Sequence, residues 1–154
     1  MRRLLSPALI AAVFLLDRAA KARVLAGLFH RSVEVAPFFR LTYAENTGVS
    51  FGLFRDKNLF FLAFSAALVA GLLALRRRIA AHGRLAEAGL ALVLGGALGN
   101  LYDRIAYGHV VDFLDFSFFP AVFNVADSAI TVGALLMAWG MRERAGQKSP
   151  RPGE

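Results

Sequence analysis

Four long runs of apolar residues, separated by shorter polar segments, dominate the pattern along the 154-residue chain. They cover about residues 4–24, 57–75, 85–105 and 121–141. A helix needs roughly 20 residues to cross the hydrocarbon core of a membrane, and the last two runs reach this length. The first run is long enough only if its helix continues through Asp17. The pattern predicts an α-helical membrane protein with four transmembrane helices in one membrane-embedded domain, residues 1–141.

The composition supports a membrane protein. Hydrophobic residues make up 57% of the chain and charged residues 19%, against roughly 25% charged in ordinary soluble domains. The net charge of +7 raises the alternative of a nucleic-acid-binding protein. Such proteins carry their basic residues on a polar face or arm, whereas here the densest basic clusters flank apolar runs. We therefore expect membrane lipid, and no nucleic acid, as a partner.

The basic clusters also predict the orientation of the helices. Three regions that would share one side of the membrane hold ten of the eighteen basic residues, namely Arg2, Arg3, Arg76, Arg77, Arg78, Arg84, Arg142, Arg144, Lys148 and Arg151. The positive-inside rule makes that side cytoplasmic. Both termini would then be cytoplasmic, with residues 142–154 as a disordered tail, and the loops 25–58 and 107–120 would face out.

The first apolar run has a second interpretation. A basic start, an apolar core and the small-x-small pattern Ala20-Lys21-Ala22 are also typical of a cleaved secretory signal. Removing it would leave the orientation of the other three helices unchanged, so the topology does not distinguish the two alternatives.

The first outer loop has the alternation of strands. Val33 and Val35 alternate with polar residues, an apolar and aromatic segment follows, and a turn is expected near 46–48. We therefore predict a small extracytoplasmic β-rich region between helices 1 and 2. Its aromatic side chains would contact the lipid interface.

Several classes of chemistry are excluded. The chain has no cysteine, which removes disulfides, thiolate metal sites and cysteine nucleophiles. Its three histidines form no His-Glu-x-x-His pattern, so we expect no metal and no cofactor. His109 alone, in a loop, is more typical of a surface residue than of a general base.

The candidate catalytic groups are carboxylates near the outer ends of the helices. Ionisable groups at membrane depth are costly and therefore mark functional sites. Asp127 lies early in the fourth apolar run, with Asn124 three residues before it and so on the same helix face. The alternative is a carboxylate at the start of a helix, where the helix dipole stabilises its negative charge and it has no catalytic role.

Asp112 is the second candidate. Its neighbours Val110, Val111, Phe113 and Leu114 indicate a partly buried loop, although a solvated loop aspartate remains an alternative. Two buried aspartates can share one proton, activate water and protonate a leaving amine.

Other charged residues are predicted to stabilise the structure rather than to take part in catalysis. Asp17 and Lys21 have the i,i+4 spacing of an ion pair within a helix. Asp103 and Arg104 are adjacent, and we expect Arg104 to pair with a nearby carboxylate or to attach the loop that follows. Gly95 and Gly99 form a small-xxx-small pair that permits close helix approach.

The motifs, taken in order, support a family resemblance. They are Asn46-Thr47-Gly48-Val49-Ser50-Phe51, Gly95-Gly96, Gly99-Asn100-Leu101-Tyr102-Asp103-Arg104, Gly108, Val111-Asp112-Phe113 and Phe123-Asn124-Val125-Ala126-Asp127-Ser128. With Asp17 and Lys21, this set resembles the lipoprotein signal peptidases, or signal peptidase II, a family of aspartyl peptidases. Arg18 departs from the glutamine common in the family, which affects only local packing.

The resemblance implies an intramembrane aspartyl endopeptidase of the bacterial inner membrane, with its active site near the outer, periplasmic face. It implies Asp112 and Asp127 as the catalytic pair, with Asn46, Gly48, Asn100, Arg104 and Asn124 shaping the site. Asp17, Lys21 and Asp103 would support it. The implied substrate is a prolipoprotein bearing a diacylglyceryl-cysteine, cleaved just before that cysteine. The implied enzyme is a monomer that the cyclic peptide globomycin inhibits.

Two other functions stay open from the residues alone. A small transporter or proton relay would use Asp127 as the carrier group and would need more polar residues in the cytoplasmic half of the helices. A non-enzymatic assembly subunit would retain its function after Asp112→Asn or Asp127→Asn substitution.

Overall fold

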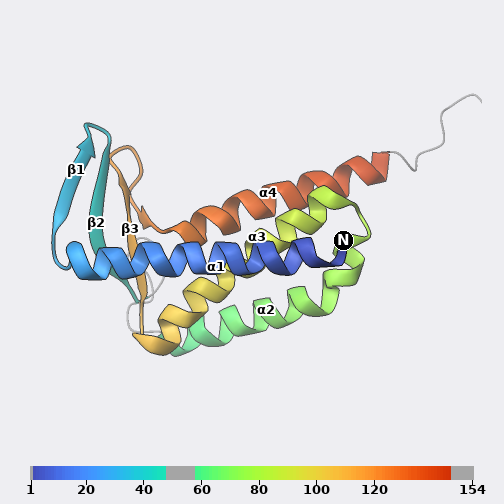
Figure 1. Cartoon of the computed structure of the whole chain (residues 1–154), viewed down its shortest axis with the longest axis horizontal. Helices are drawn as coiled ribbons and strands as arrows, with labels where there is room; N and C mark the ends of the chain where they lie inside the picture. The colour runs from blue at the N-terminus through green and yellow to red at the C-terminus, as the bar shows by residue number, and fades with distance from the viewer. Residues whose placement is uncertain (1, 48–57, 147–154) are drawn as a thin grey trace, which may run out of the picture.

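The computed structural model describes residues 2–47 and 58–146, with side chains from Ser6 to Arg142 within these ranges. Four helices account for most of the chain: α1 (Arg2–Gly27), α2 (Asn58–Ala80), α3 (Arg84–Ala106) and α4 (Val125–Gly146). They run alternately in opposite directions, so the N-terminus and the end of α4 lie at one end of the bundle (Figure 1). A small sheet lies at the other end.

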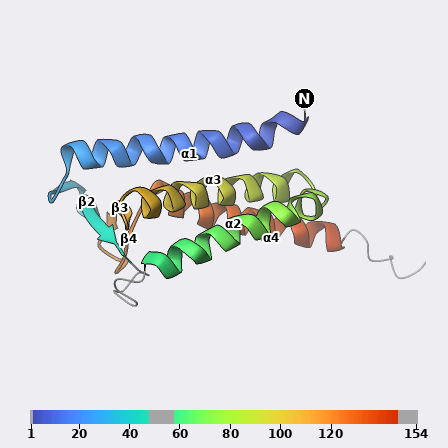
Figure 2. The same ribbon diagram turned by 90° about the horizontal axis from the view of Figure 1, so that it is seen from below.

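The central helix is α3, which packs against α1, α2 and α4 (Figure 2). Small residues allow this packing. A Cβ at Gly95 would lie 2.7 Å from the Val13 Cβ of α1, and one at Gly99 would lie 2.6 Å from the Asp17 Oδ2. The prediction that these two glycines permit close helix approach is therefore confirmed. Neither position has room for a larger residue without a shift of α1.

In contrast, α2 leaves most of its apolar surface open. Phe60 and Phe64 are 62% and 60% exposed, and of its side chains only Val69 and Ile79 are buried. Such a continuous apolar surface is typical of a helix that contacts lipid or a partner. Among the described helices, α2 and α3 are long and apolar enough to cross a membrane. The molecule therefore combines membrane-capable helices with a small antiparallel sheet.

The sheet has four antiparallel strands in sequential order: β1 (Ser32–Ala36), β2 (Phe39–Asn46), β3 (Val110–Phe116) and β4 (Val122–Phe123). The strands predicted between the first two helices are present as β1 and β2, with a turn at residues 37–38 between them. β2 ends at Asn46, and the turn predicted near 46–48 extends beyond Thr47, outside the described residues. The segment between α3 and α4 carries no strand pattern of its own and is expected to be a loop. Two strands form there because β3 pairs along β2 and buries Val111 and Phe113.

The ends of the helices differ from the expected ones. The fourth helix begins at Val125 rather than at residue 121, because the residues before it pair with β3 as β4. It continues to Gly146, into the segment expected to be disordered, and residues 147–154 lie outside the described part of the chain. The second helix runs past residue 75 to Ala80. Its last turn contains arginines, which interact favourably with the helix dipole.

Candidate active site

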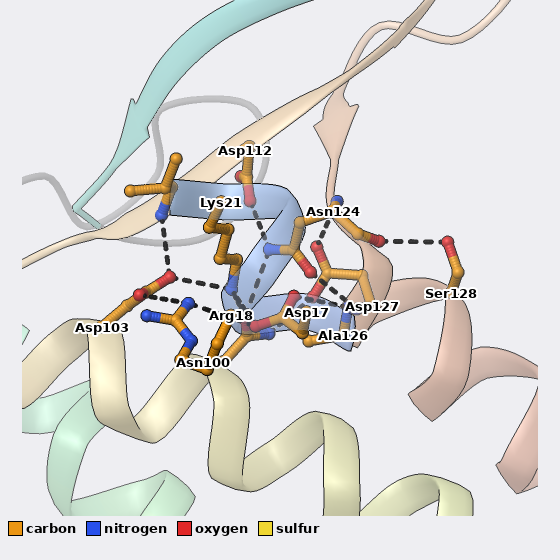
Figure 3. A network of polar contacts seen from close by, with 11 residues as sticks. Asp17, Arg18, Lys21, Asn100, Asp103, Asp112, Asn124, Ala126, Asp127 and Ser128 are labelled. Carbon is orange, nitrogen blue, oxygen red and sulfur yellow. Dashed lines mark hydrogen bonds and ion pairs between the residues drawn. The ribbon is translucent and has the colours of Figure 1, made fainter. Parts of the chain in front are cut away.

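Asp112 and Asp127 meet at the end of the bundle that carries the sheet. Asp112 lies on β3 and is 2% exposed, whereas Asp127 lies in the first turn of α4 and is partly exposed. Figure 3 shows the two carboxylates on either side of the Asn124 side chain. The fold thus brings together the two acids singled out from the sequence, one of them buried and the other partly exposed.

Asn124 caps the helix that carries Asp127. Its Oδ1 accepts a hydrogen bond of 2.8 Å from the Asp127 backbone N–H, and the Asn124 backbone N–H donates one of 3.3 Å to Asp127 Oδ2. This reciprocal pair is a capping box. The prediction that Asn124 and Asp127 share a helix face was wrong, since Asn124 precedes the helix. Asp127 is also the helix-start carboxylate of the alternative explanation, and its side chain is held in place by that role.

The same asparagine connects the two carboxylates. Its Nδ2 donates to Asp112 Oδ1 at 2.6 Å and to Asn100 Oδ1 at 3.2 Å. Asn124 thus contacts both carboxylates, Asp112 through its side-chain amide and Asp127 through its backbone N–H.

Two further side-chain amides donate hydrogen bonds to the two carboxylates, one to each. Asn100 on α3 donates from Nδ2 to Asp127 Oδ1 at 2.8 Å, and Asn46 at the end of β2 donates from Nδ2 to Asp112 Oδ2 at 2.9 Å. Asn46 reaches Asp112 because β2 pairs with β3, with Ala44 opposite Asp112. Amide donors fix the orientation of a carboxylate without adding charge to the site.

The environment of Asp112 changes its acidity. Burial raises the pKa of Asp112 to about 7, and the nearby Asp127 carboxylate raises it as well. The hydrogen bonds from Asn46 and Asn124 oppose the increase because they favour the ionised form. A carboxyl with a pKa near neutral pH can both accept and donate a proton under working conditions, which suits general acid–base catalysis.

Behind the pair lies a buried ionic cluster formed by Asp17, Arg18 and Lys21 of α1 and Asp103 of α3. Lys21 Nζ lies 2.9 Å from Asp17 Oδ2, 2.8 Å from Asp103 Oδ2 and 2.9 Å from Asn100 Oδ1. These contacts use all three donors of the ammonium. The predicted Asp17–Lys21 ion pair is present. With two acids and two bases the cluster is formally neutral, which limits the cost of burying its charges.

The cluster holds the backbone next to each acid of the pair. Asp17 Oδ1 accepts a hydrogen bond of 3.0 Å from the Ala126 N–H, one residue before Asp127. Asp103 Oδ2 accepts one of 3.2 Å from the Val111 N–H, one residue before Asp112. The support expected from Asp17, Lys21 and Asp103 therefore acts at two defined backbone positions.

The arginine of this cluster is Arg18, which the sequence analysis treated as a matter of local packing. Arg18 Nη2 lies 2.6 Å from Asp103 Oδ1 and 3.2 Å from Asp17 Oδ2. In the sequence, the position of Arg18 one helical turn before Lys21 was the feature that could have indicated its membership of this cluster. Arg104, expected to pair with a carboxylate or to attach the loop, has its guanidinium over the Phe61 ring at 5.8 Å and forms no ion pair with a described carboxylate. Gly48, another predicted site residue, lies outside the described residues.

The remaining polar candidates lie away from the pair. His109 Nδ1 is 4.0 Å from Glu45 Oε2, and Asp115 pairs with Arg40 at 2.9 Å. Over residues 2–47 and 58–146, no group of three His, Cys, Asp or Glu side chains is placed to hold a metal ion. Among the side chains that the structure describes here, the two aspartates and the amides around them are the groups placed together for chemistry.

Comparison with known proteins identifies the family. The family described as Signal peptidase (SPase) II matches residues 9–142. A lipoprotein signal peptidase of Pelotomaculum thermopropionicum is 43% identical over 93% of this chain and 95% of its own length. Another from Caldanaerobacter subterraneus is 48% identical over 71% of this chain and 74% of its own.

A solved structure has the same fold as this chain. A bacterial membrane enzyme determined by the in meso method at 2.3 Å superposes with a TM-score of 0.85 and 27% identity, covering 97% of this chain and 94% of that one. With the two aspartates in one site, membrane-capable helices and this similarity over nearly its whole length, the chain belongs to the signal peptidase II family of membrane peptidases.

Proposed function

We propose that Asp112 and Asp127 are the catalytic pair of an intramembrane aspartyl endopeptidase. The observation that carries the proposal is the Asn124 bridge, which holds both carboxylates in one site (Figure 3). The pKa of Asp112, raised to about 7, supports a pair that shares one proton at neutral pH. Neither a metal nor a covalent nucleophile is needed for this chemistry.

In the proposed reaction the ionised aspartate takes a proton from a water molecule held between the two acids. The resulting hydroxide attacks the scissile carbonyl carbon, while the protonated aspartate donates its proton to the carbonyl oxygen. The tetrahedral diol then collapses as the C–N bond breaks: the protonated aspartate gives its proton to the leaving amine, and the ionised aspartate takes the proton of one diol hydroxyl, which restores the starting pair. Asn46, Asn100 and Asn124 keep the four carboxylate oxygens oriented through both steps.

All four helices cross the membrane in this proposal, with both termini on the cytoplasmic side. At about 1.5 Å per residue, the 26 residues of α1 and the 22 residues of α4 are as long as the roughly 30 Å hydrocarbon core. The charges that lower the hydropathy of α1 include Asp17 and Lys21, which the neutral cluster accommodates. Exposed apolar residues of α4, such as Leu135 and Trp139, face lipid.

The proposed substrate is a bacterial prolipoprotein with a diacylglyceryl-cysteine, cleaved just before that cysteine by a monomeric enzyme. The lipid anchors this cysteine at the outer surface of the inner membrane, and the aspartate pair lies at the outer end of the proposed bundle. The sheet carries exposed apolar side chains there, including Val35 and Phe38 at 57% and 56% exposure. They suit contact with the lipid interface and with the acyl chains of the substrate.

The test is cleavage of a lipidated prolipoprotein by the purified protein in detergent, followed as a mobility shift. Wild type is expected to cleave, and Asp112→Asn and Asp127→Asn to be inactive although each still unfolds in a cooperative thermal transition. Asp115→Asn is the matched control, since Asp115 lies on the same strand but pairs with Arg40. Activity that EDTA abolishes, or that either site variant retains, would contradict the aspartyl mechanism.

A further inference from the structure

A cavity lies at the end of the bundle opposite the aspartate pair. It has a volume of about 590 Å³, within the roughly 300–1,000 Å³ of typical ligand pockets. Its walls come from the first part of α1, the last part of α2 and the first part of α3. In Figure 2, α3 lies between α1 and α2 and so forms the floor between them.

The deep part of the cavity is apolar. Ile10 of α1 and Leu90, Ala91 and Leu94 of α3 line it, and Leu73 of α2 lies on the facing wall. Along α3 the lining runs from Glu87 to Leu94, a length of about 10 Å. This shape suits the first part of an acyl chain running parallel to the helices.

The mouth of the cavity is basic. Arg76 and Arg77 line it and are exposed, and Leu73 and Ala80 lie one turn away on the same face of α2. The one carboxylate in the lining, Glu87, accepts a hydrogen bond of 2.6 Å from Ser6 Oγ of α1. The lining therefore contains two positively charged guanidinium groups and one carboxylate, so the mouth carries a net positive charge.

We propose that this cavity binds one anionic phospholipid, with its phosphate between Arg76 and Arg77 and an acyl chain along Leu90 and Leu94. Basic side chains above an apolar channel complement a lipid that joins an anionic headgroup to a hydrocarbon chain. In the orientation given under the proposed function, on which this inference rests, the lipid comes from the cytoplasmic leaflet. A basic signal-peptide end is disfavoured here, because it would meet the same arginines.

The test is native mass spectrometry of the full chain in detergent, with phosphatidylglycerol and phosphatidylcholine of identical acyl chains added separately. Wild type is expected to retain one phosphatidylglycerol about 30-fold more tightly than phosphatidylcholine, the effect of two juxtamembrane arginines. Arg76→Gln/Arg77→Gln is expected to remove this preference. Arg78→Gln/Arg84→Gln, which removes equal charge from the same end but not from the lining, is expected to keep it.

A second variant tests the cavity itself. Ala81 is an exposed residue of the lining, so Ala81→Trp should block the mouth without changing charge and should displace the lipid. Equal retention of the two lipids by wild type, or equal loss in both double variants, would overturn the proposal. Asp127→Asn is expected to lose cleavage but to bind phosphatidylglycerol as wild type does. A failure of the catalytic assignment is thereby distinguished from a failure of the lipid site.

Discussion

Substitutions of Asn124 separate its two roles, the helix cap and the hydrogen bond to Asp112. Serine keeps an oxygen that caps α4 but loses the amide donor that lies 2.6 Å from Asp112 Oδ1. Alanine loses both. The two variants therefore differ in the cap alone, while each differs from wild type in the contact between the catalytic candidates.

The magnitudes follow from these contacts. An N-cap contributes about 1 kcal/mol, and a hydrogen bond to a charged group about 1.5–3 kcal/mol. We expect Asn124→Ser to lower the free energy of unfolding by about 2 kcal/mol and Asn124→Ala by about 3 kcal/mol. The lost donor favoured the ionised form of Asp112, so the pKa of Asp112 should rise further above about 7. At 1.36 kcal/mol per unit, the increase is about one pH unit.

The assay is the pH dependence of kcat/KM for a lipidated prolipoprotein, together with thermal unfolding in the same detergent. The limb of the profile that Asp112 controls should move to higher pH by about one unit in both variants. Ser128→Ala is the matched control, because it removes a 3.0 Å hydrogen bond to the Asn124 carbonyl and leaves the Asn124 side chain in place. A serine variant with the wild-type profile, or a limb that moves to lower pH, would refute the reasoning.

Four further outcomes are expected. Lys21→Met should lower the free energy of unfolding by about 3–5 kcal/mol in a denaturant titration, because it leaves two buried acids opposite Arg18 alone. Gly99→Ala should cost about 1–3 kcal/mol on the same measure, since its Cβ would lie 2.6 Å from Asp17 Oδ2, whereas Gly71→Ala, with open space around it, should not destabilise. Arg18→Gln should shift to higher pH the limb of the pH–rate profile that Asp112 controls, because the cluster then carries a net negative charge. An unshifted limb would show that the charge of the cluster does not affect the acidity of the pair. The pKa of Asp112 is raised to about 7 in the folded state, whereas an ordinary aspartate has a pKa of 3.8, so wild-type stability should fall by up to about 4 kcal/mol as pH rises through this interval. Thermal unfolding of Asp112→Asn should lack this decrease.

Local patterns predicted a large part of the molecule. The apolar runs located the four helices, and the i,i+4 spacing of Asp17 and Lys21 predicted their ion pair. The apolar neighbours of Asp112 indicated its burial, which the structure confirms at 2% exposure. These features depend on residues within a few positions of one another, where helix periodicity and local burial determine the geometry.

Local patterns did not predict the contacts between segments that lie far apart in the sequence. Whether residues 110–116 form a strand depends on their pairing with β2, and nothing in their own pattern names that partner. The role of Asn124 was assigned to the wrong place, because the start of α4 depends on β4 and on the capping box. Arg18 was undervalued because its main partner, Asp103, belongs to another helix.

The sequence by itself indicated the membrane character of the chain and singled out Asp112 and Asp127 as candidate acids, since hydropathy and residue type are properties of each position. Only the tertiary structure decided that a neutral cluster of four charges holds the backbone beside each acid. The hydrogen bond from Ala126 to Asp17 joins residues 109 positions apart. Such a contact exists only once α1, α3 and α4 have packed, because packing removes the water that would otherwise solvate these charges separately.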